Sequence, residues 1–110
     1  MPAFQAEPLD GKPFTSENLA GRATVVNFFA SWCPACNMEL NELQTLRPEL
    51  AQRGIAVVTV LVDSVETPDT VGEARRMLEH DPLPFPVLLM TPAMRDVFKY
   101  EGFPATYVIG

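Results

Sequence analysis

The sequence has little of what several functional classes require. Its 8 lysines and arginines are outnumbered by 14 aspartates and glutamates, which gives a net charge of −6. Nucleic-acid binding needs the opposite balance, because basic side chains neutralise the phosphates. No apolar run approaches the roughly 20 residues of a membrane-spanning helix. We therefore expect no nucleic-acid partner and no membrane span within this chain.

Cysteine and histidine are also scarce. The two cysteines, Cys33 and Cys36, are separated by two residues, and the single histidine, His80, lies far along the chain. A structural zinc site needs four ligands, and a disulfide that closes so short a loop removes little entropy from the unfolded chain. The pair therefore favours redox chemistry. We expect no metal and no cofactor other than a redox-active Cys33–Cys36 disulfide.

The chain does contain enough apolar residues for a single core. Its 110 residues are 47% hydrophobic, which is ordinary for one globular domain. We predict one domain with an N-terminal arm or hairpin over residues 1–22 and a core over 23–110. Within the arm, Leu9–Phe14 predicts a tight turn and Ser16–Gly21 a single helical turn.

Alternating strands and helices are predicted for the rest of the chain. Two apolar runs rich in β-branched residues are typical of parallel strands that are buried on both faces. The predicted strands cover 23–30, 55–62, 85–90 and 105–109, and the predicted helices cover 34–53, 70–80 and 91–100. We expect a loop over 65–69, with Asp69 as the N-cap of the second helix. This alternation indicates an α/β fold.

The Cys-x-x-Cys motif stands where the first apolar run ends and the first helix begins. Pro34 suits the first helical position, since its missing N–H costs nothing there. Unpaired N–H groups and the positive dipole end stabilise a thiolate at a helix start, and the pKa of the attacking cysteine in such motifs falls from about 8.5 to roughly 3.5–7.5. We expect Cys33 to be the exposed nucleophile and Cys36, one turn further, to be the resolving thiol against the core.

Helical spacing places a row of leucines on the same inward stripe as Cys36. The row consists of Leu40, Leu43, Leu46 and Leu50. Glu39 borders this stripe, and a carboxylate that is partly removed from water near the dithiol opposes thiolate formation. The alternative is an exposed surface glutamate, as we expect for Glu42 and Glu49.

Asn27 interrupts the first apolar run. A buried amide needs hydrogen-bond partners, and one interpretation is that Asn27 bonds only backbone groups. Because an amide does not titrate, it cannot itself take a proton from Cys36.

The stretch Val25-Val26-Asn27-Phe28-Phe29-Ala30-Ser31-Trp32-Cys33-Pro34-Ala35-Cys36 resembles the active-site strand and helix start of the thioredoxin superfamily. It most resembles the TlpA/ResA/CcmG branch of extracytoplasmic thiol–disulfide oxidoreductases. Leu9–Phe14 and Gly102–Ile109 match the same family. The resemblance implies a thioredoxin-like fold with a mixed central sheet and helices on both faces. The family pattern continues beyond Gly110, so its last strand and helix are expected to be missing here.

The resemblance also implies roles for single residues near the dithiol. Pro104 matches the family's cis-proline that faces the dithiol, and Phe103 before it offers its backbone to an extended substrate. Trp32 and Pro34 shape the binding face, the alternative for Trp32 being a partly buried core aromatic.

Three further positions are compared with the family. Asn27 stands where thioredoxin has a buried aspartate, and Glu39 stands where the branch has a glutamate that tunes the dithiol. CcmG-like members often carry an acid where this chain has Ala105, which argues against that cytochrome-specific subgroup.

The implied function is the reduction of protein disulfides, supplied with electrons by an upstream thiol donor for which a membrane reductase is one candidate. The family's location is periplasmic or extracytoplasmic; the N-terminus has no basic-then-apolar signal pattern, so a cytoplasmic location is the alternative. A peroxiredoxin-like peroxidase is a second possible function, although Ala30 stands where it needs threonine or serine. A non-enzymatic binding module of the same fold is a third.

Overall fold

A computed structural model of the chain describes residues 5–6, 14–15, 23–98, 102 and 104–109. Near the N-terminus, β1 (Gln5–Ala6) and β2 (Phe14–Thr15) pair antiparallel. The helical turn predicted at 16–21, and the turn predicted at 9–14 apart from its last residue, lie outside the described residues.

The main sheet has four strands in the order β5-β4-β3-β6. They are β3 (Thr24–Phe29), β4 (Ala56–Leu61), β5 (Val87–Leu89) and β6 (Ala105–Ile109). The pairs β3–β4 and β4–β5 are parallel, whereas β6 runs antiparallel to β3. Every residue of β3 is buried, as expected for a central strand covered on both faces.

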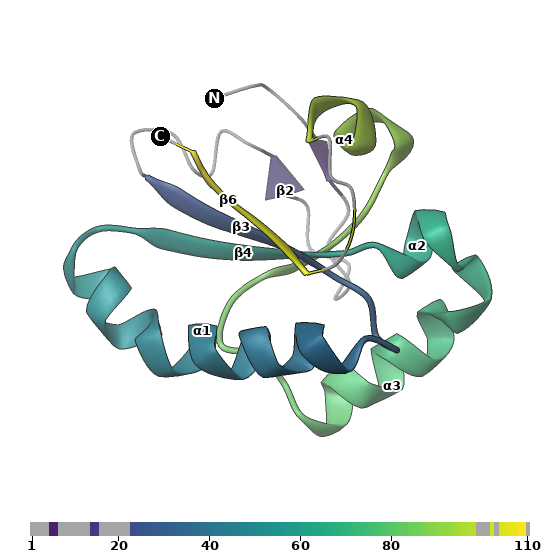
Figure 1. Ribbon diagram of the computed structural model, residues 1–110, viewed down its shortest axis with the longest axis horizontal. Coiled ribbons are helices and arrows are strands. Elements are labelled where there is room, and N and C mark those ends of the chain that lie inside the picture. The colour runs from purple at the N-terminus through teal and green to yellow at the C-terminus, as the bar shows by residue number, and fades with distance from the viewer. Residues whose placement is uncertain (1–4, 7–13, 16–22, 99–101, 103, 110) are drawn as a thin grey trace.

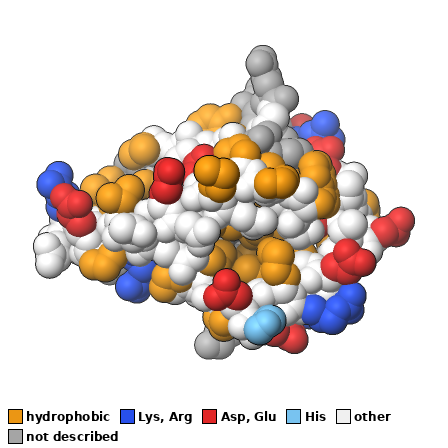
Figure 2. Space-filling view, turned by 60° about the horizontal axis from the view of Figure 1, so that its bottom comes forward, with side chains coloured by type: hydrophobic (Ala, Val, Ile, Leu, Met, Phe, Trp, Pro, Cys, Tyr) orange, Lys and Arg blue, Asp and Glu red, His pale blue; other side chains and the backbone are white. Residues whose placement is uncertain are grey.

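Helices cover both faces of this sheet (Figure 1). The long helix α1 (Pro34–Gln52) and α3 (Val71–His80) lie below the sheet in that view, and α4 (Pro92–Val97) lies above it. Figure 2, which turns the lower side forward, shows apolar side chains interspersed with charged ones. The predicted thioredoxin-like α/β architecture is thus confirmed. No helix within the described ranges is long and apolar enough to cross a membrane.

Helix α1 begins and ends with local signals. Cys33 is its N-cap residue and Pro34 its first helical residue. At the other end Gly54 has φ +74°, its N–H donates to the Ala51 carbonyl (3.0 Å), and the Ile55 N–H donates to the Leu50 carbonyl (2.9 Å). This is a Schellman motif, which needs a left-handed residue where Gly54 stands.

The inward stripe of α1 differs from the prediction at one residue. Cys36, Leu40 and Leu43 are buried and Leu50 is partly buried, but Leu46 is 47% exposed. At 100° per residue, Leu46 lies roughly 80° around the helix from Cys36. It therefore falls at the edge of the stripe and points to solvent.

The segment after β4 also differs from the prediction. The expected loop at 65–69 instead holds the short helix α2 (Asp63–Glu66) and the 3-10 helix η2 (Pro68–Thr70), which leads directly into α3. Asp69 lies inside η2 and is not the N-cap residue of α3. Thr70 is the N-cap residue, but its hydroxyl donates to Asp63 and does not cap the helix. A 3-10 turn often leads into an α-helix in this way.

Two further elements, β5 and α4, are shorter than predicted. Strand β5 covers only the middle of 85–90, and α4 ends at Val97, with Thr91 capping it through a 3.2 Å bond from the Met94 N–H. Residues 99 and 100 of the predicted helix lie outside the described residues.

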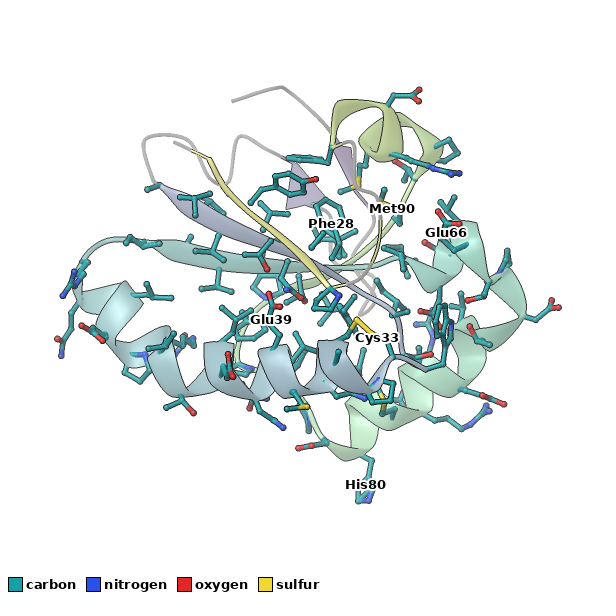
Figure 3. All side chains as sticks on the ribbon, viewed as in Figure 1. Phe28, Cys33, Glu39, Glu66, His80 and Met90 are labelled. Atoms are coloured by element: carbon teal, nitrogen blue, oxygen red, sulfur yellow. A yellow bond between two sulfur atoms is a disulfide. The ribbon has the colours of Figure 1, made fainter. Side chains whose placement is uncertain are left out.

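Three aromatic rings, one each from β3, β6 and the end of α4, form a cluster. The Phe28 ring lies 5.4 Å from the Phe98 ring and 5.7 Å from the Tyr107 ring, centroid to centroid. Phe28 is fully buried above the level of the disulfide (Figure 3). The cluster joins the strand that leads to the cysteines with β6 and the end of α4.

Candidate active site

Cys33 and Cys36 form a disulfide where β3 leads into α1 (Figure 3). Their Cα atoms are 5.2 Å apart, within the usual range for a disulfide. Cys36 is fully buried, as predicted. The prediction that Cys33 is exposed is wrong for this oxidised form, because only 9% of its surface remains accessible. Bonding to Cys36 holds its sulfur against the helix end, although Cys33 is still the more accessible of the two.

The first turn of α1 directs an N–H at the Cys33 sulfur. The Cys36 N–H donates to Cys33 Sγ over 3.2 Å, and the Asn37 N–H donates to the Cys33 carbonyl over 3.2 Å. Since free N–H groups at a helix start stabilise negative charge, the same N–H can stabilise a Cys33 thiolate once the disulfide opens.

Three polar side chains meet between α1 and the sheet. Asn27 Nδ2 donates to Glu39 Oε1 (2.8 Å) and to Thr106 Oγ1 (3.0 Å), and the Thr106 hydroxyl donates to the same Glu39 oxygen. Glu39 is half-buried and lies between α1 and the sheet (Figure 3). It is therefore not the exposed surface glutamate of the alternative interpretation.

Asn27 is bonded through side chains, so the alternative that it bonds only backbone groups is wrong. Its Oδ1 atom is buried without a hydrogen-bond partner. Thr106 was missed by the sequence analysis. The signal for it is the strand register, because Thr106 lies directly opposite Asn27 on β6.

Trp32 stands beside the disulfide on the surface. Its side chain is 51% exposed, and its Nε1–H donates to Thr67 Oγ1 over 3.0 Å. The alternative of a partly buried core aromatic is therefore wrong. Pro34 follows as an exposed residue at the start of α1.

Pro104 stands directly before β6 and is partly buried. Ala105 pairs with Phe28, so Pro104 lies at the carboxyl end of β3, the end from which the chain continues to Cys33. Phe103 lies outside the described residues.

Asp63 is a site residue that the sequence analysis missed. It is fully buried, and its Oδ1 accepts from the Ser31 N–H (2.9 Å), while its Oδ2 accepts from Ser31 Oγ (2.5 Å) and Thr70 Oγ1 (2.6 Å). A signal existed, because β3 and β4 were both predicted as buried parallel strands. The residues that follow such neighbouring strands meet at one edge of the sheet.

The only histidine of the chain lies away from the disulfide. His80 is exposed at the end of α3 and points away from Cys33 (Figure 3). Within the part of the chain that the structure describes, no three His, Cys, Asp or Glu side chains form a group that could hold a metal ion.

A mixed sheet covered by helices on both faces, with a Cys-x-x-Cys disulfide between a central strand and a helix start, defines a thioredoxin-like protein with a dithiol–disulfide site. The model of the AhpC/TSA family matches residues 1–109. The chain therefore belongs to the AhpC/TSA family.

Individual relatives agree with this assignment. The chain is 27% identical over 108 residues to the thioredoxin-like protein YneN of Bacillus subtilis strain 168, covering 98% of this chain and 62% of YneN. It is 28% identical over 113 residues to the thiol-disulfide oxidoreductase ResA of Oceanobacillus iheyensis, covering 98% of this chain and 56% of ResA. The chain thus spans about six-tenths of the length of these curated relatives.

Solved structures give the same result. A thiol:disulfide interchange protein of the thioredoxin family from Chlorobium tepidum TLS superposes with a TM-score of 0.83 at 32% identity, covering 98% of this chain and 75% of that one. A putative thiol:disulfide interchange protein DsbE from Chlorobium tepidum has a TM-score of 0.82 at 22% identity, covering 98% and 73%. The resemblance to thioredoxin-like thiol–disulfide oxidoreductases that the sequence indicated is confirmed.

Proposed function

We propose that this protein is a thiol–disulfide oxidoreductase that reduces disulfides of other proteins with the Cys33–Cys36 dithiol. The observation that carries the proposal is the disulfide at the start of α1, where the Cys36 N–H donates to Cys33 Sγ. A helix start favours the thiolate, and the thiolate is the reactive form of cysteine. The names of the ResA and interchange-protein relatives support the same chemistry.

The reaction consists of two exchanges. In the reduced protein, Cys33 Sγ attacks one sulfur of a substrate disulfide; a Cys33–substrate bond forms, and the other substrate sulfur leaves as a thiolate that takes up a proton. Cys36 then loses its proton and attacks Cys33 Sγ, which closes the Cys33–Cys36 disulfide and releases the second substrate thiol. The substrate gains two electrons and the protein loses two, and an upstream thiol donor restores the dithiol.

The surface around the disulfide suits an extended, partly apolar substrate. Trp32 and Met38 are both strongly exposed large apolar side chains on either side of Pro34 and Ala35, which are exposed as well. Amphipathic and aromatic side chains at such a surface bind a protein chain through buried area. Pro104 and Phe103 are proposed to hold the substrate backbone, and Trp32 and Pro34 its side chains.

Asn27 and Glu39 are proposed to tune the dithiol. They form one bonded group with Thr106, so the Glu39 carboxylate is held on the helix that carries Cys36 and cannot turn to solvent freely. A fixed negative charge near the dithiol raises the free energy of a thiolate. Asn27 does not titrate and acts by holding that charge.

The proposed location is the periplasm or another extracytoplasmic compartment, with a membrane reductase as the upstream donor. This rests on the resemblance to the extracytoplasmic branch of the superfamily. The redox state of the cysteines in cells tests it: alkylation trapping should find the dithiol form, and that form should convert to the disulfide when the membrane donor is removed.

The reduction potential of the Cys33–Cys36 pair tests the proposed function most directly. The protein is equilibrated in glutathione or dithiothreitol buffers, and the free thiols are counted by alkylation and mass. A value near about −270 mV, as in thioredoxin, is expected for a reductase, whereas about −120 mV would make the protein an oxidant. The absence of a reversible two-electron couple would overturn the oxidoreductase proposal in favour of a binding module. Consumption of peroxide by the reduced protein would favour the peroxidase.

A further inference from the structure

Asp63 is the only charged side chain that is fully buried among the residues that the structure describes. A carboxylate is costly to bury unless hydrogen bonds replace its water. Here three donors do so, two of them from Ser31 and one from Thr70. Ser31 stands two residues before Cys33, so a carboxylate after β4 holds the turn that leads to the reactive cysteine.

The hydrogen bonds continue from Asp63 to Trp32 in one direction. An ionised carboxylate only accepts, so Thr70 gives its single hydroxyl proton to Asp63 Oδ2, a closer acceptor at 2.6 Å than the Thr67 carbonyl at 2.8 Å. Thr67 must then be the donor in its 2.8 Å bond with Thr70, and Thr67 Oγ1 accepts from Trp32 Nε1. In this series of hydrogen bonds Trp32 donates to Thr67, Thr67 donates to Thr70, and Thr70 donates to Asp63.

The Ser31–Trp32 turn, which Asp63 holds, has few backbone hydrogen bonds of its own. Within the turn the Cys33 N–H donates to the Ala30 carbonyl over 3.2 Å, while the Ser31 N–H goes to Asp63 and not to a backbone oxygen. One carboxylate therefore fixes both the backbone before Cys33 and, through two threonines, the indole of Trp32. Bonds to a charged acceptor are stronger than neutral ones, which suits this role.

We propose that Asp63 is a positioning residue of the active site. It sets the Ser31–Trp32 turn, and with it the position of Cys33 Sγ before the α1 N–H groups and the face that Trp32 presents to substrate. The functional part of this inference rests on the proposed oxidoreductase function. A displacement of reacting groups by about 1 Å can lower a rate about 100-fold, so the turn need not unfold for the effect to be large.

The test compares Asp63→Asn with Asp69→Asn. Asparagine keeps the shape and one acceptor oxygen, but its amide nitrogen cannot accept from the two hydroxyls. Asp69 is exposed on η2 in the same segment and loses the same charge. Trp32 is the only tryptophan of the chain, so its emission spectrum and its quenching by acrylamide report this site alone.

For Asp63→Asn we expect a shifted Trp32 emission maximum, quenching increased about twofold, and a fall in kcat/KM for insulin reduction of roughly tenfold or more. Asp69→Asn should match the unaltered protein within about twofold in each measurement. The proposal is overturned if the two variants behave alike, or if Asp63→Asn changes the emission but not kcat/KM. If the unaltered protein reduces no disulfide, the proposed function fails, while emission and quenching still decide whether Asp63 positions the turn.

Thr67→Val provides a second test if Asp63→Asn does not fold. It removes the acceptor of the Trp32 N–H but leaves the three bonds to Asp63 in place. Trp32 emission and quenching should change as in Asp63→Asn, and KM should rise with less effect on kcat. Thr45→Val on the exposed face of α1 is the matched control. Equal spectra for these two threonine variants would show that the hydrogen bond from Trp32 to Thr67 does not orient the indole. That result would overturn the proposal for Trp32.

Discussion

Cys33 and Cys36 differ in accessibility, and this difference supports the proposed order of their reaction. Of the two, only Cys33 reaches the surface, and Cys36 is fully buried within the core. We therefore propose that a substrate disulfide reacts first with Cys33, and that Cys36 then attacks the bond formed at Cys33.

Replacing Cys36 with serine is expected to trap the first intermediate. The Cys36→Ser protein should form a stable mixed disulfide between Cys33 and the substrate, because no second thiol resolves it. Cys33→Ser should form none and should have no turnover. Non-reducing electrophoresis with an insulin substrate, followed by peptide mass mapping, measures both. A trapped complex in the Cys33→Ser protein would reverse the assigned order.

The Glu39 charge is expected to slow the reaction of Cys33. Glu39→Gln keeps the oxygen that accepts from Asn27 and Thr106 but removes the charge, so a thiolate nearby is opposed less. Alkylation of reduced Cys33 by iodoacetamide at pH 7 should become roughly threefold to tenfold faster. Glu42→Gln, exposed on the same helix, is the control. Equal rates in the two variants would contradict a tuning role for Glu39.

What the sequence could predict at this scale depended on distance along the chain. The cysteines, Pro34 and the helix start lie within one short stretch, and local rules describe such a stretch. Asn27 and Thr106 are 79 positions apart, and Ser31 and Asp63 are 32 apart. Such pairs follow from strand pairing, which the sequence indicates only after the neighbours of each strand are known.

At the scale of elements, the strands and the two long helices were predictable because each has a strong period and a clear end signal. The Schellman motif at Gly54 and the proline start of α1 are examples. Leu46 and Asp69 were misplaced for a shared reason. In both cases a local rule was applied without the exact geometry of the helix: the leucine spacing drifts around α1 before Leu46, and a residue type that suits an N-cap does not show that a 3-10 turn precedes α3.

The end of α1 offers a matched pair of glycine substitutions. Gly54→Ala should lower the free energy of unfolding by about 1 kcal/mol, because φ is +74° and an L side chain there is strained by roughly 1–2 kcal/mol. A Cβ at Gly54 would meet no atom within 4 Å, so the cost is conformational.

Gly72→Ala in α3 should have the opposite sign and raise the free energy of unfolding by up to about 1 kcal/mol. Its Cβ would meet only the Arg76 Nη1 atom at 3.7 Å, the far end of a flexible side chain. Urea denaturation followed by circular dichroism measures both variants. A stabilised Gly54→Ala protein would show that the left-handed conformation at the end of α1 is not required.

At the scale of the whole molecule, β3 connects the core to the chemistry. Its side chains include both Phe28, in the aromatic cluster, and Asn27, in the group with Glu39, and its end leads to Cys33. On one side β6 supplies Thr106, and on the other side the segment that follows β4 supplies Asp63, the first residue of α2. The site is therefore built around β3, from β6 on one side and from the start of α2 on the other, and its geometry depends on how β3 is packed.

Phe28→Ala is expected to lower the free energy of unfolding by about 3–5 kcal/mol, the usual cost of emptying a fully buried phenylalanine site. A domain of this size has only about 5–15 kcal/mol in total, so the variant should unfold at much lower urea concentration. Val108→Ala on β6, where the side chain is 72% exposed, should change stability by no more than about 0.5 kcal/mol.

Urea titration of the oxidised proteins, followed by circular dichroism and by Trp32 emission, compares the two. Because Trp32 lies at the site and circular dichroism reports the whole chain, coincident transitions are expected if the core and the site unfold together. A Trp32 transition that precedes the other would show that the site opens while β3 remains packed, and would contradict the dependence of the site on this strand.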